Sequence, residues 1–215
     1  MSPKRSLVSS KNTLYRGYQN RREKTKEIRQ RFLIVCEGEK TEPNYFKSFR
    51  VPKEVMDIRG VAHNTVSLVK KTIKIQKEEN DYDQVWCVFD KDDFPAENFE
   101  QAIELAKQHN IKVAYSNEAF EIWYILHFCY RDTPMSRQEY QNALTKQLKN
   151  AGLMNNKEKY QKNSVDMYEK LENLQATAIR NAKKLLEEYS YPNPAYDNPS
   201  TTIHLLVEEL NKFIN

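Results

Sequence analysis

The chain has 215 residues, of which 39% are hydrophobic and 11% aromatic, enough for one medium-sized domain with a core. No apolar run approaches the roughly 20 residues of a transmembrane helix, and no secretory signal is visible, so we expect a cytoplasmic protein without a membrane partner. Three cysteines lie inside apolar runs, there is no CxxC or HExxH motif, and glycine is scarce. These features argue against a disulfide framework, a zinc site and a glycine-rich phosphate loop.

The first part of the chain is strongly basic. Residues 1–31 carry ten Lys or Arg against two Glu, a net charge of +8, so the other 184 residues carry −4. We expect residues 1–30 to form a flexible arm that contacts a polyanion, most simply nucleic acid. The candidate phosphate-binding side chains are Arg21, Arg22, Lys24, Lys26 and Arg29. An ordinary solubilising tail is the alternative reading of the same composition.

Apolar runs alternate with amphipathic segments in the first half of the chain. Strands are predicted at 31–36, 54–59, 84–89 and 111–115, and helices at 42–49, 65–79 and 96–108, with Asn64 or Thr65 as the cap of the second helix. Strands that alternate with helices of this length predict a doubly wound parallel sheet.

The second half of the chain has a helical pattern. Residues 119–130 are apolar almost all round, which predicts a buried helix with Ser116 or Asn117 as its cap. Further helices are predicted at 136–150, 165–189 and 199–214, with a proline-containing loop at 190–199. We therefore expect an α/β domain over residues 31–130 and a helical C-terminal addition over residues 131–215, packed on that domain.

Acidic side chains follow two of the predicted strands. Glu37 comes directly after the first strand, and Asp90 and Asp92 follow the third. Open parallel sheets bind ligands at the carboxyl ends of their strands, and neighbouring strands are only about 4.8 Å apart. Crowded carboxylates repel one another, and a divalent cation with a preference for oxygen ligands relieves that repulsion. The pattern predicts a site for Mg²⁺ or Mn²⁺, and two such ions can support phosphodiester cleavage.

Each acidic signal also has a structural interpretation. Asp90 and Asp92 are residue types common in turns, and Glu37 and Glu42 would suit the start of a helix. Weaker site candidates lie near the same strand ends: Glu39, Lys40, Glu42, Asn117, Glu121 and Lys162. Glu121 is the one charged residue in the apolar segment and needs a partner. Lys40 and Lys162 could contact phosphate or simply face solvent, and His127 reads as a core histidine.

Four longer motifs extend these observations: LIVCEGEKTEPNYF, VFDKDDF, SNEAFEIWYILHF and NPSTTIHLLVEEL. The first two resemble the Toprim fold, which has a Glu after its first strand and a DxD after its third. Over about residues 31–214 the chain more closely resembles the RloB-like proteins of prokaryotic defence and restriction loci. The resemblance implies a Toprim-like parallel sheet with flanking helices, and a nuclease active in antiviral defence. It puts Glu37, Asp90 and Asp92 at the metal-binding, catalytic positions.

The function expected from this resemblance is a metal-dependent endonuclease. RNA, including tRNA, is slightly favoured over DNA by analogy alone. Relatives are often encoded beside an SMC/ABC-like ATPase, which is the expected partner, and we expect low activity without it. Oligomerisation is left open. A non-catalytic nucleic-acid-binding or regulatory subunit is the main alternative. A nucleotidyl or primase-type transferase is a third, although the sequence has no separate nucleotide-binding motif.

Overall fold

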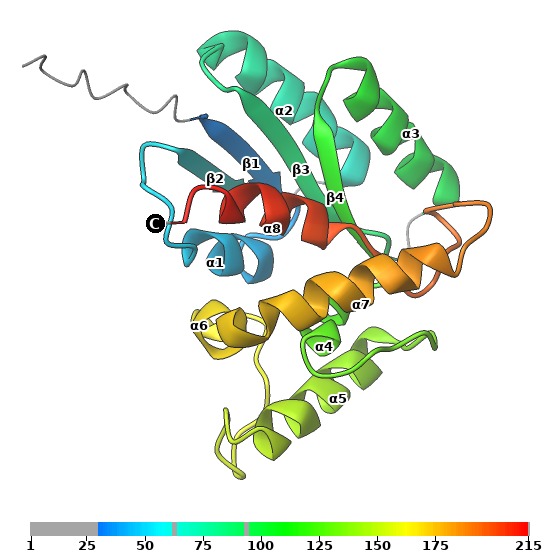
Figure 1. The fold of residues 1–215 in the computed structure, drawn as a ribbon. Coiled ribbons are helices and arrows are strands. Elements are labelled where there is room, and N and C mark those ends of the chain that lie inside the picture. Colours follow the sequence, from blue (N-terminus) through cyan, green and yellow to red (C-terminus); the bar gives the residue numbers. More distant parts are fainter. Residues whose placement is uncertain (1–29, 62–63, 93–94, 215) are drawn as a thin grey trace, which may run out of the picture.

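The fold is a five-stranded, mostly parallel sheet with helices on both faces and a helical C-terminal region (Figure 1). The computed structural model describes residues 30–61, 64–92 and 95–214. The basic candidates Arg21, Arg22, Lys24, Lys26 and Arg29 lie outside the described residues. The elements in chain order are β1 (Phe32–Cys36), α1 (Thr41–Lys47), β2 (Met56–Gly60), α2 (Thr65–Glu79), β3 (Gln84–Asp90), α3 (Ala96–Gln108), β4 (Lys112–Asn117), α4 (Glu121–Leu126), α5 (Arg137–Asn150), α6 (Met167–Leu171), the 3₁₀ turn η1 (Glu172–Leu174), α7 (Gln175–Glu187), β5 (Ser200–Thr201) and α8 (Ile203–Asn211).

The strand order in the sheet is β2-β1-β3-β4-β5. Strands β1 to β4 are parallel, and β5 pairs antiparallel with the end of β4. All five residues of β1 are buried, as expected for a central strand covered on both faces. The predicted α/β fold class is confirmed.

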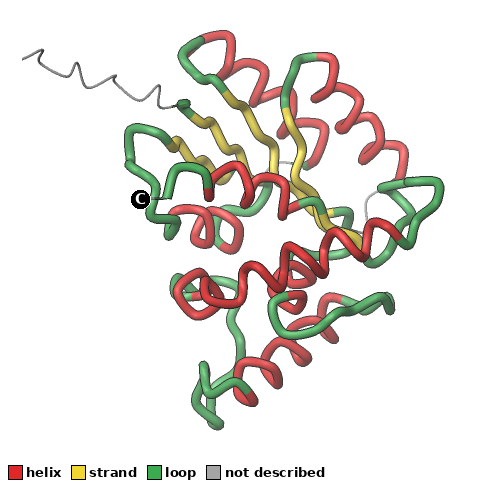
Figure 2. Tube along the Cα trace, viewed as in Figure 1, coloured by secondary structure: helices red, strands yellow, loops and turns green. Residues whose placement is uncertain are grey.

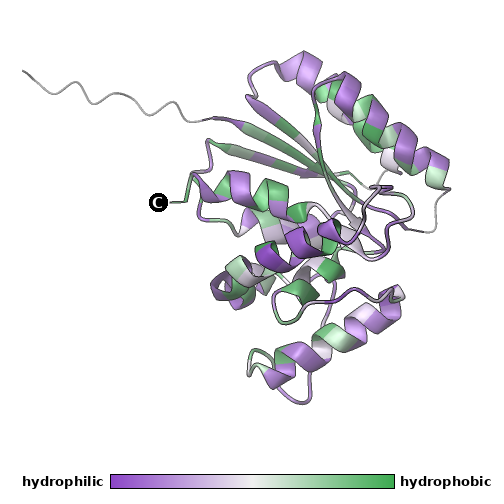
Figure 3. Ribbon diagram, turned by 45° about the vertical axis from the view of Figure 1, so that its right-hand side comes forward, coloured by the Kyte–Doolittle hydropathy of each residue, from purple (hydrophilic) through white to green (hydrophobic). Residues whose placement is uncertain are grey.

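Helices cover the two faces of the sheet unequally. Leu33 and Val35 of β1 face α2 and α3, whereas Phe32, Ile34 and Cys36 face a larger core that includes residues of α1 and α4 to α8. Figure 2 shows the strands running between these two sets of helices. Hydrophobic residues gather where the helices meet the sheet (Figure 3). The C-terminal region completes this second layer and also supplies a strand, because β5 belongs to it.

Several predicted boundaries are confirmed. Helices α2 and α3 begin and end where the sequence pattern placed them, and the side chain of Asn64 accepts a hydrogen bond from the backbone N–H of Ser67 at 3.0 Å, as a helix cap does. Helix α5 begins one residue later than predicted, after Ser136, which forms a capping box with Glu139.

Three predictions for the second half were wrong in detail. The apolar segment 119–130 contains a helix of only six residues, α4, and Ser116 and Asn117 belong to β4 instead of capping it, because they pair with Thr201 and Ser200. For the same reason the last helix starts at Ile203 and not at 199. The predicted helix 165–189 is interrupted by the 3₁₀ turn η1.

Within the described residues, no helix has the length and apolar character that crossing a bilayer requires. All three cysteines are free thiols; Cys36 and Cys87 are buried and Cys129 is partly exposed.

Candidate functional site

The candidate site lies at the carboxyl ends of β1 and β3, where the strand order changes direction. In the sheet, β1 lies between β2 and β3, so the chain goes from β1 to the neighbour on one side and then returns to the neighbour on the other. Doubly wound sheets bind their ligands at such a reversal of strand order. The backbone N–H of Glu37 donates to the carbonyl of Val88 at 2.8 Å. The Glu37 carboxylate in turn accepts from the backbone N–H of Asp90 at 3.3 Å and from the Thr65 hydroxyl at 3.5 Å. The two strand ends are therefore joined directly.

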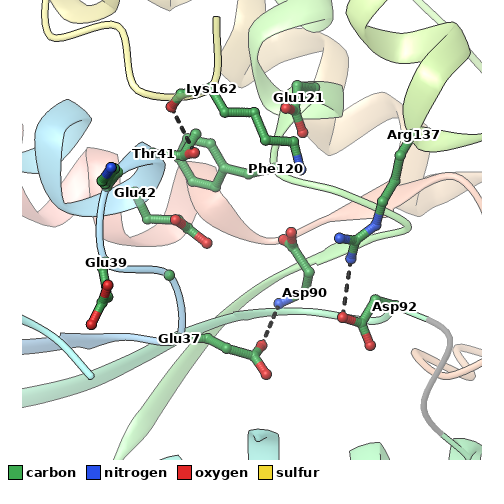
Figure 4. A pocket seen from close by; sticks show the side chains of 12 residues that line it. Glu37, Glu39, Thr41, Glu42, Asp90, Asp92, Phe120, Glu121, Arg137 and Lys162 are labelled. Atoms are coloured by element: carbon green, nitrogen blue, oxygen red, sulfur yellow. Dashed lines mark hydrogen bonds and ion pairs between the residues drawn. The ribbon is translucent and has the colours of Figure 1, made fainter. Parts of the chain in front are cut away.

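A cavity of about 430 Å³ opens beside these strand ends. Its charged lining combines six carboxylates with three cationic side chains: Glu37, Glu39, Glu42, Asp90, Asp92, Glu121, Lys40, Lys162 and Arg137. Figure 4 labels all of them except Lys40 and shows Asp90 on the sheet, Arg137 on a helix and Lys162 on a loop. All three primary candidates and five of the six weaker ones line this one cavity. Asn117 does not; its side-chain amide donates to the carbonyl of Pro194 at 3.3 Å.

The loop after β1 depends on two glycines. A Cβ on Gly38 would clash with Oε2 of Glu42, so the absent side chain leaves room for the Glu42 carboxylate. A Cβ on Gly60, at the end of β2, would lie 2.7 Å from the Gly38 carbonyl oxygen. The two glycines therefore permit the close approach of the loop to β2 and of Glu42 to the loop, and Glu42 lines the cavity while only 5% exposed.

The carboxylates are held in an unfavourable electrostatic environment. Burial, aided by the charges of Asp92 and Glu42, raises the pKa of Glu37 to about 7, although the Asp90 backbone N–H opposes this rise. Burial and then the nearby Glu42 and Glu121 raise the pKa of Asp90 well above its ordinary value. Burial also raises the pKa of Glu42, with Glu121 adding to it. Carboxyl groups that resist ionisation in this way favour a nearby cation.

Arg137 supplies one such cation, and it was not among the residues predicted for the site. Its guanidinium forms an ion pair with the Asp92 carboxylate at 3.1 Å (Figure 4). Arg137 is the first residue of α5, and the capping box at Ser136 fixes where that helix begins. No local motif marks Arg137, because its role depends on a carboxylate 45 residues earlier in the chain.

Two residues of the segment before α6, Tyr160 and Lys162, also contact residues of the acidic cavity. The Tyr160 hydroxyl donates to the Glu121 carboxylate at 3.4 Å, which gives this 2% exposed acid a hydrogen-bond partner. The Thr41 hydroxyl donates to the backbone carbonyl of Lys162 at 2.8 Å, and the Lys162 side chain extends into the cavity (Figure 4). The Lys162 charge partly offsets the effect of burial on the pKa of Glu42.

His127 belongs to the core and not to this cavity. It is 1% exposed, and its Nδ1–H donates to the Trp123 carbonyl at 2.9 Å. Burial lowers the pKa of His127 to about 4, so the imidazole is neutral at pH 7.

A protein-family model described as RloB-like protein matches residues 32–210. The chain belongs to the RloB-like protein family. The matched region runs from β1 into α8 and so contains every residue that lines the acidic cavity. No curated protein and no solved structure matches the chain.

The donor set of this RloB-like site suits a hard divalent cation. Glu37, Asp90 and Asp92 offer only carboxylate oxygens, the ligands that Mg²⁺ and Mn²⁺ prefer. Burial first, and neighbouring carboxylates second, raise the pKa values of Glu37 and Asp90, and a bound cation would offset both effects. Within the described residues, no group of three or more His, Cys, Asp or Glu side chains is arranged so that it could hold a metal ion without rearrangement. Asp92 instead pairs with Arg137, so metal binding by all three acids requires side-chain movement.

Proposed function

We propose that this RloB-like protein is a metal-dependent phosphodiesterase, an endonuclease that cuts nucleic acid in antiviral defence. The observation that carries the proposal is the meeting of Glu37, Asp90 and Asp92 in one cavity at the switch point of the sheet. Family membership supports it, because RloB-like proteins are generally Toprim-type nucleases.

In this proposal Glu37, Asp90 and Asp92 hold Mg²⁺ or Mn²⁺. When bound, such an ion supplies an activated water and positive charge for the phosphate at the reacting centre. The chain's own cations surround the same point: Arg137 and Lys162 would contact the non-bridging oxygens of the scissile phosphate. In this proposal the Arg137 guanidinium leaves its ion pair with Asp92 and binds the phosphate, so that the Asp92 carboxylate is free to bind the metal ion.

The proposal also includes the substrate, the partner protein and the cellular compartment. RNA, including tRNA, is slightly favoured over DNA by analogy with related defence nucleases. We expect an ATPase encoded in the same locus to be the partner, and low activity without it, because an unrestrained nuclease would harm its host. We expect the protein to act in the cytoplasm, where the buried thiols of Cys36 and Cys87 stay reduced.

The test compares wild type with Asp90→Asn and Glu37→Gln on labelled total RNA and plasmid DNA, in Mg²⁺, Mn²⁺ and EDTA, with and without the ATPase. Glu100→Gln is the matched control, since it removes one charge from an exposed residue of α3, outside the cavity. Cuts that need metal and are lost in both site variants, but not in the control, support the proposal. Cuts that persist in both site variants contradict it.

One observation favours a second function, a non-catalytic nucleic-acid-binding or regulatory subunit. The Asp92 carboxylate is already paired with Arg137, and the described residues contain no ready-made metal site. That reading predicts binding of nucleic acid with no cleavage at any metal concentration, even with the ATPase present.

A further inference from the structure

A second cavity, of about 470 Å³, adjoins the acidic one. It lies between α5 and the segment 159–163, which precedes α6. Lys40 and Lys162 line both cavities, so the two spaces meet at these lysines. We call the second cavity the amide groove.

The amide groove differs from the acidic cavity in its chemistry. Its lining contains Lys40, Lys159 and Lys162 and no carboxylate. None of these three ammonium groups forms an ion pair with another described residue. Five carboxamide side chains also line it: Gln138, Gln141, Asn142, Gln161 and Asn163, and the hydroxyl-bearing Thr145 and Tyr160 complete the lining. The groove therefore offers positive charge together with many neutral donors and acceptors.

Three hydrogen bonds, two to α5 and one to α1, hold the segment between α5 and α6 in place. The backbone N–H of Tyr160 donates to the Thr145 hydroxyl of α5 at 3.1 Å, and the Lys149 ammonium of α5 donates to the Asn156 carbonyl at 2.7 Å. At the other end, the Thr41 hydroxyl of α1 donates to the Lys162 carbonyl. In Figure 1 the segment between α5 and α6 runs back from the far end of α5 towards α6. The backbone of the segment 159–163 is thus held against α5 and α1 before any ligand binds, which reduces the entropy cost of binding.

We propose that the amide groove binds an unpaired polynucleotide strand next to the phosphate that enters the acidic cavity. The proposal rests on the proposed nuclease function. Lys40 and Lys162 contact the phosphate between the two cavities, Lys159 contacts the next phosphate, and the carboxamides hydrogen-bond to exposed base edges.

The chemistry of the groove favours a single strand over a duplex. Carboxamides carry both donors and acceptors and can match Watson–Crick edges, which are available only on unpaired bases. The cavity volume is that of a site for one small ligand, which suits a nucleotide or two. The groove presents no carboxylate to repel the backbone, unlike the neighbouring cavity.

The test is a charge reversal in the groove, Lys159→Glu, against the same reversal outside it, Lys146→Glu. Both residues are exposed, and Lys146 is on α5 but lines neither cavity. Both changes are made in full-length Asp90→Asn protein, so that labelled strands stay intact in Mg²⁺. Fluorescence anisotropy then measures binding of short unpaired RNA, unpaired DNA and the matching duplexes over a range of salt concentrations, and thermal melting checks folding.

We expect Lys159→Glu to weaken binding of unpaired strands about tenfold and to lower the salt slope by about one. Lys146→Glu should change the affinity by less than about twofold, and Asn142→Ala should reduce the preference for unpaired over paired strands. Comparing the affinities for unpaired RNA and unpaired DNA shows which of the two sugars, ribose or deoxyribose, the groove binds better. Equal affinities for the two charge reversals, or equal binding of duplex and single strand by the parent protein, overturn the proposal.

Failure of the groove and failure of the nuclease give different results. If the parent binds single strands through the groove but wild type cuts nothing even with the ATPase and metal present, the groove stands and the nuclease falls. If wild type cuts in a metal-dependent way and Lys159→Glu binds and cuts normally, the nuclease stands and the groove falls.

Ultraviolet crosslinking adds an independent readout of where the strand binds, because bound nucleotides should attach to peptides within residues 138–163.

Discussion

Replacing Glu37 by Gln should stabilise the protein while it removes the proposed activity. Glu37 is held between the ends of β1 and β3, where burial raises the pKa of its carboxyl from 4.5 to about 7. A raised pKa means that the charged carboxylate is less stable in the folded protein than in the unfolded chain. Gln keeps the shape, and its carbonyl oxygen can still accept from the Asp90 backbone N–H, but it carries no charge.

The size of the effect follows from the pKa and depends on pH. Between pH 4.5 and pH 7 the folded state keeps a proton that the unfolded state has released, so the wild type loses stability as the pH rises through this window. The full difference corresponds to roughly 3 kcal/mol. Glu37 is only partly buried, and solvent screening reduces the expected gain in the variant to about 1–2 kcal/mol, or about 2–8 °C in Tm for a chain of this size.

The assay is urea unfolding in EDTA at pH 8.5 and at pH 4.5, with Glu100→Gln as the exposed control. Glu37→Gln should be more stable than wild type at pH 8.5 and equal to it at pH 4.5, and added Mg²⁺ should narrow the gap by stabilising the wild type. A variant that is less stable at pH 8.5, or whose gain is the same at both pH values, would refute the electrostatic reasoning.

Three further predictions concern residues around the site and in the core. Arg137→Ala should slow cleavage about 100-fold in single-turnover assays but change the unfolding free energy by less than about 1 kcal/mol, because its ion pair with Asp92 is partly exposed. Ser136→Ala removes the cap of α5 and should cost about 1 kcal/mol in urea unfolding. The pKa of His127 is about 4, so its contribution to stability is complete above about pH 6.5 and is lost as the pH falls towards 4. His127→Gln should flatten this part of the pH–stability curve, measured by urea unfolding, by up to about 3 kcal/mol.

The first half of the fold was predictable because its two central strands, β1 and β3, are marked by their own residues. The runs in β1 and β3 are continuous and apolar, and their burial on both faces is what that pattern requires. Once the strands are parallel neighbours, Glu37 and Asp90 must lie at the same edge of the sheet. The meeting of these two acids is thus a consequence of chain topology that a single sequence can reveal.

The parts that escaped prediction depend on distant partners. Strand β5 consists of two polar residues, Ser200 and Thr201, and is extended only because it pairs with the end of β4. That pairing also explains why Ser116 lies in a strand and does not cap a helix. Locally, Arg137 is one cation at the start of an amphipathic helix, and only the tertiary fold, in which α5 packs on α4, brings it to Asp92.

The charges of the site are divided along the chain. Five of its six carboxylates come from residues 37–92, whereas Arg137 and Lys162 come from the C-terminal region, leaving Lys40 as the early cation. The sheet alone would therefore present a strongly repulsive acidic edge, and the C-terminal region supplies much of the charge that makes this edge tolerable and able to receive a phosphate. The same region, through α5 and the segment 159–163, forms most of the wall of the amide groove. The C-terminal region is accordingly part of the site itself: it sets how much of the acidic charge is left for a metal ion, and where a substrate strand can lie.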